Sequence, residues 1–263
     1  MDLSRGVDPV STRELLDSHT WAGSGGARSS GKIMTQIKAI VFDKDGTLFD
    51  FNATWGIWSR GLLAEESRGD PALEVRMADA LGYDLATSTF RSDSIVIAAT
   101  TDIVADQLMP LLPEQSKPAL LARMDARAIL APQVETTPLI PLLQTLKARG
   151  LQLGIATNDT EIPARAHLAA AGIEHMFDFI AGFNSGYGGK PAPGQLIAFA
   201  QATGVPPQHC AMVGDSLHDL HAARAAGMVA VGVLTGLATR ADLAPVADVV
   251  LDSIADLPDW LDR

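Results

Sequence analysis

The sequence is poor in cysteine, in cationic side chains and in long apolar runs, and each shortage excludes a class of protein. The single cysteine, Cys210, excludes a disulfide within the chain and is typical of a reducing compartment. Lys and Arg number 20 against 31 Asp and Glu, and the net charge of −11 argues against nucleic acid or an anionic membrane as the main partner. No apolar run approaches the roughly 18 residues of a membrane helix. We therefore expect a cytoplasmic protein.

The first 35 residues differ in composition from the rest of the chain. A charged segment without the apolar centre of a secretory signal is followed by a run rich in glycine and serine, 23–31. We expect residues 1–35 to form a flexible tail. Met34 stands directly before the first clear strand signal, so it is an alternative start of the native chain.

Short apolar segments rich in β-branched residues alternate with helical segments over most of the remaining sequence. They predict strands at 37–42, 151–156, 179–181, 210–213, 229–233 and 249–251. Several of the intervening helices end at a glycine, the usual residue after a helix. Repeated strand–helix units indicate a parallel sheet covered on both faces, which is an α/β, Rossmann-like, doubly wound fold.

The stretch 51–137 has a different pattern, because strand signals fade and helical spacing takes over. Asp70-Pro71, for example, has the form of an N-cap followed by a proline in the first turn. The strand before this stretch belongs to the same sheet as the strands after it. We therefore expect an all-helical cap, 51–137, inserted into a catalytic core made of 36–50 and 138–263.

Polar side chains follow four of the predicted strands, at the point where each strand ends. They lie in the segments 43–47, 157–159, 189–191 and 214–219. The carboxyl ends of the strands border the ligand crevice of an open parallel sheet, so we expect these side chains to form one site. Crowded carboxylates repel one another, and a divalent cation relieves that repulsion. Mg²⁺ prefers oxygen ligands and binds carboxylates together with substrate phosphates, so the pattern predicts Mg²⁺-assisted chemistry on a small phosphorylated metabolite.

Asp43 and Asp45 are two residues apart, and the glycine that follows them allows the chain to turn. Both carboxylates can then reach the same phosphorus atom, one as a nucleophile and the other as a general acid and base. Lys190 supplies a positive charge for the phosphate oxygens and Thr157 supplies a hydroxyl donor.

Four segments resemble, in order and spacing, the motifs of the haloacid dehalogenase superfamily. They are Asp43-Lys44-Asp45-Gly46-Thr47-Leu48, Thr157-Asn158, Lys190-Pro191 and Gly214-Asp215-Ser216-Leu217-His218-Asp219. The resemblance covers about 36–263. It implies that Asp43 forms an aspartyl-phosphate, and that Asp45 is the general acid and base and binds Mg²⁺ through its backbone carbonyl.

The same resemblance implies roles for the other motif residues. Thr157 and Lys190 would hold the transferring phosphoryl group, and Asn158 and Gly46 would add backbone or amide contacts to it. Asp43, Asp45, Asp215 and Asp219 would form the metal site. In that site Asp215 would be a direct ligand, and Asp219 would act through water or by orienting Lys190.

Within the superfamily the later part of the chain most resembles bacterial phosphoglycolate phosphatases, in the segments 155–158, 189–193 and 226–228. The resemblance implies 2-phosphoglycolate as the expected substrate. A sugar phosphate or nucleotide phosphatase, a phosphoryl mutase similar to β-phosphoglucomutase, and a non-catalytic sensor of phosphorylated metabolites are the alternatives. In the cap, Trp55 and Trp58 are expected to pack together or to form a wall of the substrate pocket. Three cap arginines are either solvated or able to bind a substrate carboxylate: Arg60, Arg91 and Arg127.

Overall fold

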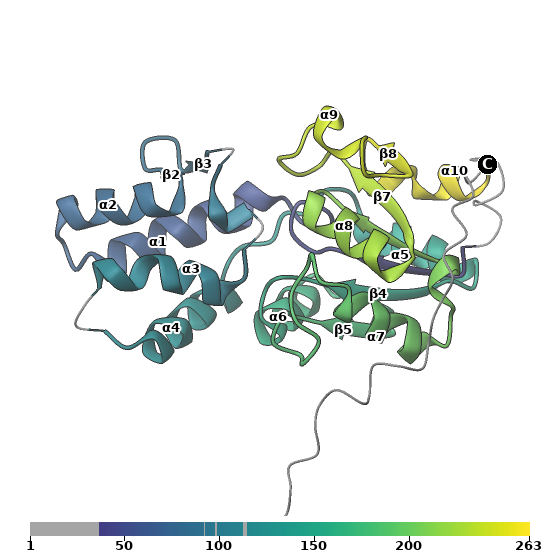
Figure 1. The fold of residues 1–263 in the computed structure, drawn as a ribbon, viewed down its shortest axis with the longest axis horizontal. Helices are drawn as coiled ribbons and strands as arrows, with labels where there is room; N and C mark the ends of the chain where they lie inside the picture. The colour runs from purple at the N-terminus through teal and green to yellow at the C-terminus, as the bar shows by residue number, and fades with distance from the viewer. Residues whose placement is uncertain (1–36, 92, 98, 113–114) are drawn as a thin grey trace, which may run out of the picture. The chain divides into compact units, whose positions relative to one another are not determined.

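The computed structural model describes residues 37–91, 93–97, 99–112 and 115–263 (Figure 1). The predicted flexible tail, 1–35, lies outside these residues. The described residues belong to one compact unit. In this part of the chain no helix combines the length and the apolar character that crossing a membrane requires.

Six strands form one parallel sheet, with β1 near its centre. In chain order they are β1 (Ala39–Phe42), β4 (Gln152–Ala156), β5 (Phe179–Ala181), β6 (Cys210–Gly214), β7 (Val229–Val233) and β8 (Val249–Leu251). Across the sheet their order is β5-β4-β1-β6-β7-β8, and Phe42 of β1 lies opposite Ile155 of β4 and Val213 of β6. The chain thus extends the sheet first on one side of β1 and then on the other. Such a reversal next to β1 is where a ligand crevice is expected, beyond the carboxyl ends of the strands.

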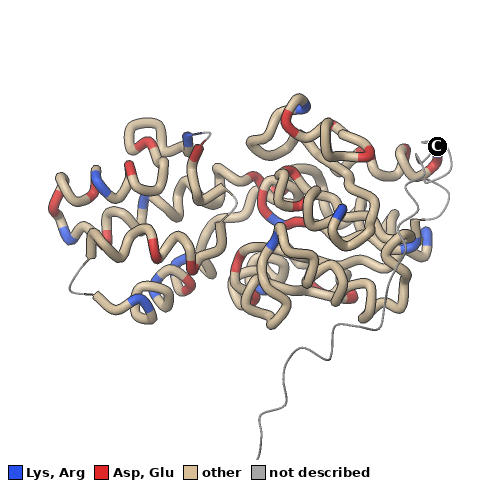
Figure 2. Tube along the Cα trace, viewed as in Figure 1, with Lys and Arg blue, Asp and Glu red and all other residues tan. Residues whose placement is uncertain are grey.

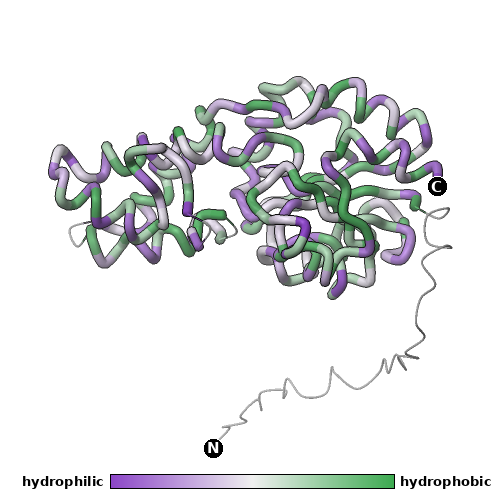
Figure 3. Tube along the Cα trace, turned by 90° about the horizontal axis from the view of Figure 1, so that it is seen from above, coloured by the Kyte–Doolittle hydropathy of each residue, from purple (hydrophilic) through white to green (hydrophobic). Residues whose placement is uncertain are grey.

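Helices cover both faces of the sheet, as the alternation of strand side chains requires. Ile40 and Phe42 belong to one buried apolar cluster, while Ala39 and Val41 belong to another. Figure 3 shows strongly hydrophobic segments running through the interior of this part of the molecule. The helices are α5 (Leu139–Ala148), α6 (Glu161–Ala170), α7 (Gly194–Thr203), α8 (Leu217–Ala226), α9 (Arg240–Leu243) and α10 (Leu257–Leu261), with 3-10 turns η5 (Glu174–Met176), η6 (Pro207–His209) and η7 (Ile254–Asp256). The predicted doubly wound α/β fold is confirmed.

Residues 51–137, here called the cap segment after the role proposed from the sequence, have a separate apolar core. Trp58, Leu63, Met77, Leu108 and Met124 are among its buried residues. The elements are a π-helical turn η2 (Asn52–Gly56), α1 (Ile57–Glu66), α2 (Pro71–Leu81), β2 (Tyr83–Asp84), β3 (Thr89–Phe90), η3 (Ile95–Ile97), α3 (Thr101–Leu108), η4 (Met109–Leu111) and α4 (Lys117–Ile129). The division of the chain into a cap domain, 51–137, and a catalytic core, 36–50 and 138–263, remains a proposal.

The cap segment differs from the expected all-helical form by the antiparallel pair β2–β3. The Asp84 carboxylate accepts hydrogen bonds from the backbone of Ala86 and Thr87, and Ser88 adopts a left-handed φ of 56°. These features make a tight turn between two strands of two residues each. Strands this short carry no alternating apolar pattern, which is why the sequence did not predict them.

Candidate active site

Asp43 directly follows β1, and its carboxylate contacts Lys190 from the loop after β5. The Oδ1 atom of Asp43 lies 2.6 Å from Lys190 Nζ, and both side chains are buried. Burial raises the pKa of the Asp43 carboxyl to about 7, although the Lys190 ammonium opposes the shift. The carboxylate proposed as nucleophile is therefore held next to a positive charge and out of bulk water.

Gly46 allows the turn after β1 to approach Asp215 closely. Its φ is +80°, and a Cβ atom on Gly46 would lie 2.4 Å from Asp215 Oδ2. The backbone of the turn is fixed by a hydrogen bond from Gly46 to the Phe49 carbonyl and by one from the Thr235 hydroxyl to the Gly46 carbonyl. Any side chain at this position would displace a carboxylate proposed as a metal ligand.

Three buried carboxylates, Asp43, Asp215 and Asp219, could hold one metal ion. One oxygen from each lies within 4.8 Å of the others. Burial first, and then the charges of Asp43 and Asp219, raises the pKa of Asp215 well above its ordinary value. A dication placed among these oxygens would remove that cost, so the donor set fits a hard cation such as Mg²⁺. The carboxylate of Asp45 is not part of this group among the described residues; its expected contribution was the backbone carbonyl.

Asp219 both caps a helix and contacts Lys190, and of the two roles expected from the sequence this contact agrees with orientation of Lys190. It forms a capping box with Ser216 at the start of α8, where its Oδ2 accepts hydrogen bonds from the Ser216 backbone and hydroxyl. Its Oδ1 lies 2.7 Å from Lys190 Nζ. Helix capping and orientation of Lys190 are thus performed by one carboxylate. Figure 2 shows acidic and basic segments meeting at this end of the sheet.

Asn158 holds the backbone of Lys190 on both sides. Its Oδ1 accepts from the Lys190 N–H at 2.8 Å, and its Nδ2 donates to the Lys190 carbonyl at 2.9 Å. Although burial opposes the shift, the carboxylates of Asp219 and Asp43 raise the pKa of Lys190, which stays charged. Thr157 is buried, and its hydroxyl accepts from the Asp159 N–H at 3.1 Å. The side chain of Asn158 thus positions Lys190.

Lys44, Asp159 and His167 were not assigned a function from the sequence. Lys44 is fully buried, and its Nζ atom lies 2.6 Å from Asp45 Oδ1 and 3.0 Å from His167 Nδ1. The position of Lys44 inside a motif at the end of a buried strand could have indicated a role in the site. His167 gave no such indication, because it lies 123 residues away on α6.

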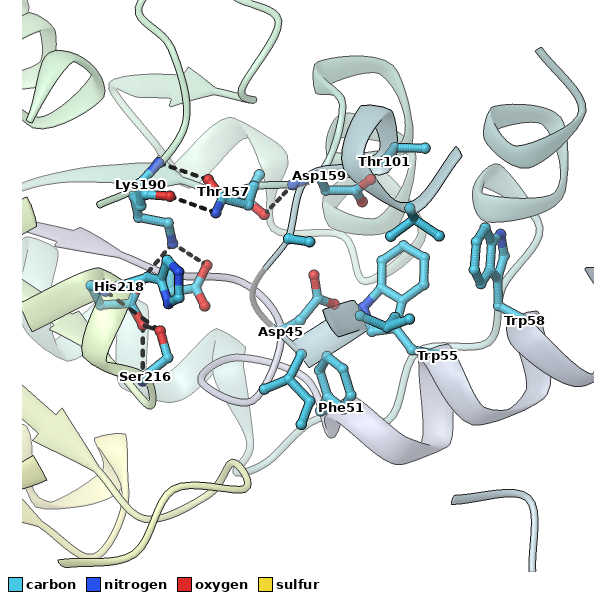
Figure 4. Close-up of a pocket in the computed structure, with 17 residues that line it drawn as sticks. Asp45, Phe51, Trp55, Trp58, Thr101, Thr157, Asp159, Lys190, Ser216 and His218 are labelled. Carbon is cyan, nitrogen blue, oxygen red and sulfur yellow. Dashed lines mark hydrogen bonds and ion pairs between the residues drawn. The ribbon is translucent and has the colours of Figure 1, made fainter. Parts of the chain in front are cut away.

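A pocket opens above these carboxylates, and residues of the cap segment form one wall of it (Figure 4). Its floor includes Asp43, Asp45, Thr157 and Lys190. Among the described residues, its cap-segment side is apolar except for one threonine: Phe51, Trp55, Trp58, Val96, Ile97, Ala99, Thr101 and Val104. The two tryptophans pack edge to face at 5.2 Å, so they both pack together and line the pocket.

The three cap arginines do not line this pocket. Arg60 donates to the Leu85 carbonyl, Arg91 forms an ion pair with Asp79 at 3.2 Å, and Arg127 forms one with Glu65. The alternative of a solvated, ion-paired role for these arginines therefore agrees with the structure.

A family model of haloacid dehalogenase-like hydrolases matches residues 37–227, which is more than half of the chain. The chain belongs to the haloacid dehalogenase-like hydrolases. The resemblance inferred from the four motifs is thus confirmed, as is an enzyme of the phosphoric monoester hydrolase class.

Several phosphoglycolate phosphatases are similar to this chain over most of its length. A phosphoglycolate phosphatase of Rhodospirillum rubrum is 31% identical over 85% of this chain and 90% of its own length. One of Chromobacterium violaceum is 32% identical over 87% of this chain and 98% of its own. The crystal structure of a predicted phosphoglycolate phosphatase from Haemophilus somnus 129pt matches with a TM-score of 0.66 at 22% identity, covering 86% of this chain and 98% of that one. The last comparison supports the fold alone.

Proposed function

We propose that this hydrolase cleaves a small phosphate monoester in a Mg²⁺-dependent reaction that passes through an aspartyl-phosphate on Asp43. The observation that carries the proposal is the contact of the buried Asp43 carboxylate with Lys190, beside Asp215 and Asp219, on the floor of one pocket. Mg²⁺ bound by these carboxylates would neutralise charge on the phosphoryl oxygens. The cap segment covers the pocket and limits the entry of water.

The first step transfers the phosphoryl group to the protein. A carboxylate oxygen of Asp43 attacks phosphorus, and the bond between phosphorus and the ester oxygen breaks. Asp45, which lines the same pocket, gives its proton to that oxygen, so an alcohol leaves. During this transfer Lys190 balances the negative charge of the phosphoryl oxygens, and both Lys190 and Thr157 hold these oxygens by hydrogen bonds.

The second step releases phosphate and restores the enzyme. Asp45, now ionised, takes a proton from a water molecule while the water oxygen attacks the phosphorus. The bond from phosphorus to Asp43 breaks, and inorganic phosphate leaves with Asp45 protonated again. The same residue thus acts as acid in one step and as base in the other.

The names of the relatives support 2-phosphoglycolate as the substrate. The pocket adds a constraint, because no described side chain of the cap-segment wall is cationic. A carboxylate-bearing ester would meet an apolar wall, in which Thr101 is the polar side chain. The substrate panel must therefore include phosphate esters of the same size whose alcohol part carries no charge.

The test is phosphate release from 2-phosphoglycolate, ethyl phosphate, sugar phosphates and nucleotides by wild type and Asp43→Asn, with Mg²⁺ or with chelator. We expect turnover with Mg²⁺ only, and a loss of at least about 10³-fold in Asp43→Asn, because a nucleophile is removed. Near-normal activity of folded Asp43→Asn would refute the nucleophile assignment. Transfer of phosphate to a sugar hydroxyl without release would favour the mutase.

A further inference from the structure

Lys44 is a buried cation that lies between groups of the active site and of the cap segment. Its side chain is fully buried, and Nζ has three polar neighbours: Asp45 Oδ1 at 2.6 Å, His167 Nδ1 at 3.0 Å and Asp159 Oδ2 at 3.6 Å. The indole ring of Trp55 lies 5.6 Å from Nζ. A buried ammonium needs such partners, so these contacts fix the position of Lys44.

The contacts of His167 define its proton. Because Lys44 Nζ can only donate, Nδ1 of His167 is the acceptor, and the ring proton is on Nε2. Nε2 lies 2.6 Å from the carbonyl oxygen of Ala128 and therefore donates to it. Burial, followed by the Lys44 charge, lowers the pKa of His167 to about 4, in agreement with a neutral ring. His167 thus joins Lys44 to Ala128.

Ala128 belongs to α4 of the cap segment, whereas His167 belongs to α6 of the sheet region. The two helices pack against each other, and a second hydrogen bond, from the Thr160 hydroxyl to Asp125, joins them at 2.8 Å. A continuous chain of hydrogen bonds therefore runs from the α4 backbone through His167 and Lys44 to Oδ1 of Asp45.

We propose that Lys44 and His167 are positioning residues that hold Asp45 at the leaving group and make its placement depend on the hydrogen bond from His167 on α6 to Ala128 on α4. Lys44 donates to Oδ1 of Asp45, which leaves Oδ2 to carry the proton that Asp45 gives and takes. If α4 moves away from α6, His167 loses its acceptor on Ala128, and the chain that orients Lys44 is broken. The inference rests on the proposed function for the role of Asp45.

The test uses two esters that differ in how much they need an acid. The nitrophenolate of 4-nitrophenyl phosphate leaves without a proton, whereas the alkoxide of benzyl phosphate needs one. The kcat/KM values include only steps up to phosphoryl transfer to Asp43, so they exclude the later hydrolysis. A purely structural role would lower kcat/KM for both esters by the same factor.

Three variants interrupt the chain at different links. Lys44→Met removes the donor to Asp45. In His167→Asn the amide keeps an acceptor for Lys44 near the Nδ1 position and loses the hydrogen bond to the Ala128 carbonyl. In His167→Gln the amide keeps a donor to Ala128 near the Nε2 position and loses the hydrogen bond from Lys44. Thr160→Val is the matched control, because it removes the other bond between α4 and α6 and leaves the chain intact.

We expect Lys44→Met to lower kcat/KM about 100-fold for benzyl phosphate and less than about tenfold for 4-nitrophenyl phosphate, because general acid catalysis contributes about 10²- to 10⁴-fold. Both His167 variants should show the same selective loss, and Thr160→Val should change both esters alike. In an Asp45→Asn background the selective loss should vanish, because Lys44 and His167 both act through Asp45.

Equal losses for both esters in the His167 variants, or an undiminished selective loss in the Asp45→Asn background, would overturn the inference. If Lys44→Met does not fold, as judged by circular dichroism, the His167 pair decides alone. If wild type with Mg²⁺ cleaves neither ester nor any member of the substrate panel, the proposed function itself fails. The two failures are thus distinct.

Discussion

The carboxylates at the end of β1 outnumber the positive charges that face them. Lys190 contacts Asp43 and Asp219, while Asp215 accepts a long hydrogen bond of 3.4 Å from the Thr47 hydroxyl. The result is a raised pKa for Asp43 and Asp215, with burial as the largest cause. A bound cation would supply the missing charge, and the metal-free protein keeps protons instead.

This imbalance predicts how stability depends on pH. The pKa of Asp43 is about 7 in the folded protein and roughly 3.9 in an unfolded chain. The folded state therefore holds a proton that the unfolded state has lost, and the stabilisation from Asp43, complete below about pH 4, disappears as the pH rises through about 7. In chelator, the melting temperature of wild type minus that of Asp43→Asn should fall between pH 5 and pH 8.

Mg²⁺ provides the internal check on this prediction. The ion binds ionised carboxylates, so the rise in melting temperature on adding Mg²⁺ should be larger at pH 8 than at pH 5, and smaller in Asp43→Asn. Differential scanning calorimetry measures both quantities. A difference between the two proteins that stays constant with pH would contradict the assigned shift of Asp43.

At the scale of elements, the turn between β1 and the cap segment combines two requirements at Gly46. The first is a left-handed φ of +80°, and the second is an approach to Asp215 that leaves no room for a Cβ atom. Gly172, which follows α6, shares only the first requirement, since its φ is +72° and a Cβ atom there would have no neighbour within 4 Å. The two glycines therefore separate backbone strain from crowding.

Alanine at these positions should have different consequences. Gly172→Ala is expected to lower the free energy of unfolding by about 1 to 2 kcal/mol, the cost of a left-handed alanine, and to keep full activity. Gly46→Ala carries the same cost and also displaces the Asp215 carboxylate, so phosphate release should fall at least about 100-fold. Urea unfolding and Mg²⁺ titration of activity test both. Equal activity in the two variants would show that Asp215 tolerates displacement.

The elements of the sheet could be predicted because each strand has its own apolar run and its own polar end. Polar side chains at the carboxyl ends of parallel strands lie at one edge of the sheet. This rule alone predicts a common site for four residues, Asp43, Thr157, Lys190 and Asp215, without knowledge of any contact. The link from Lys44 to His167 could not be predicted, because the register of α6 against α4 depends on packing. The two hydrogen bonds from Asn158 to the Lys190 backbone were missed for a similar reason, since they depend on the path of the loop before Lys190.

At the scale of the whole molecule, the pocket joins a polar floor to an apolar wall. The floor residues belong to the sequence motifs at the strand ends. The wall includes residues from η2, α1, η3 and α3 that no motif connects. In the reaction proposed above, the wall faces the part of the ester that leaves as the alcohol, so we expect it to determine which alcohol is accepted. No described side chain of this wall is cationic. We therefore expect that one substitution can change the preference for esters whose alcohol part carries a carboxylate.

Val96 is the position at which to change it, because it lines the pocket and is only partly buried. Val96→Lys should raise kcat/KM for 2-phosphoglycolate relative to ethyl phosphate about tenfold, equivalent to about 1.4 kcal/mol, because the ammonium attracts the carboxylate. Ile103→Lys adds the same charge to an exposed site on α3 outside the pocket, and should leave the ratio unchanged. If both lysines raise the ratio equally, long-range attraction explains it and the wall does not select the alcohol. If neither does, the carboxylate does not reach this wall.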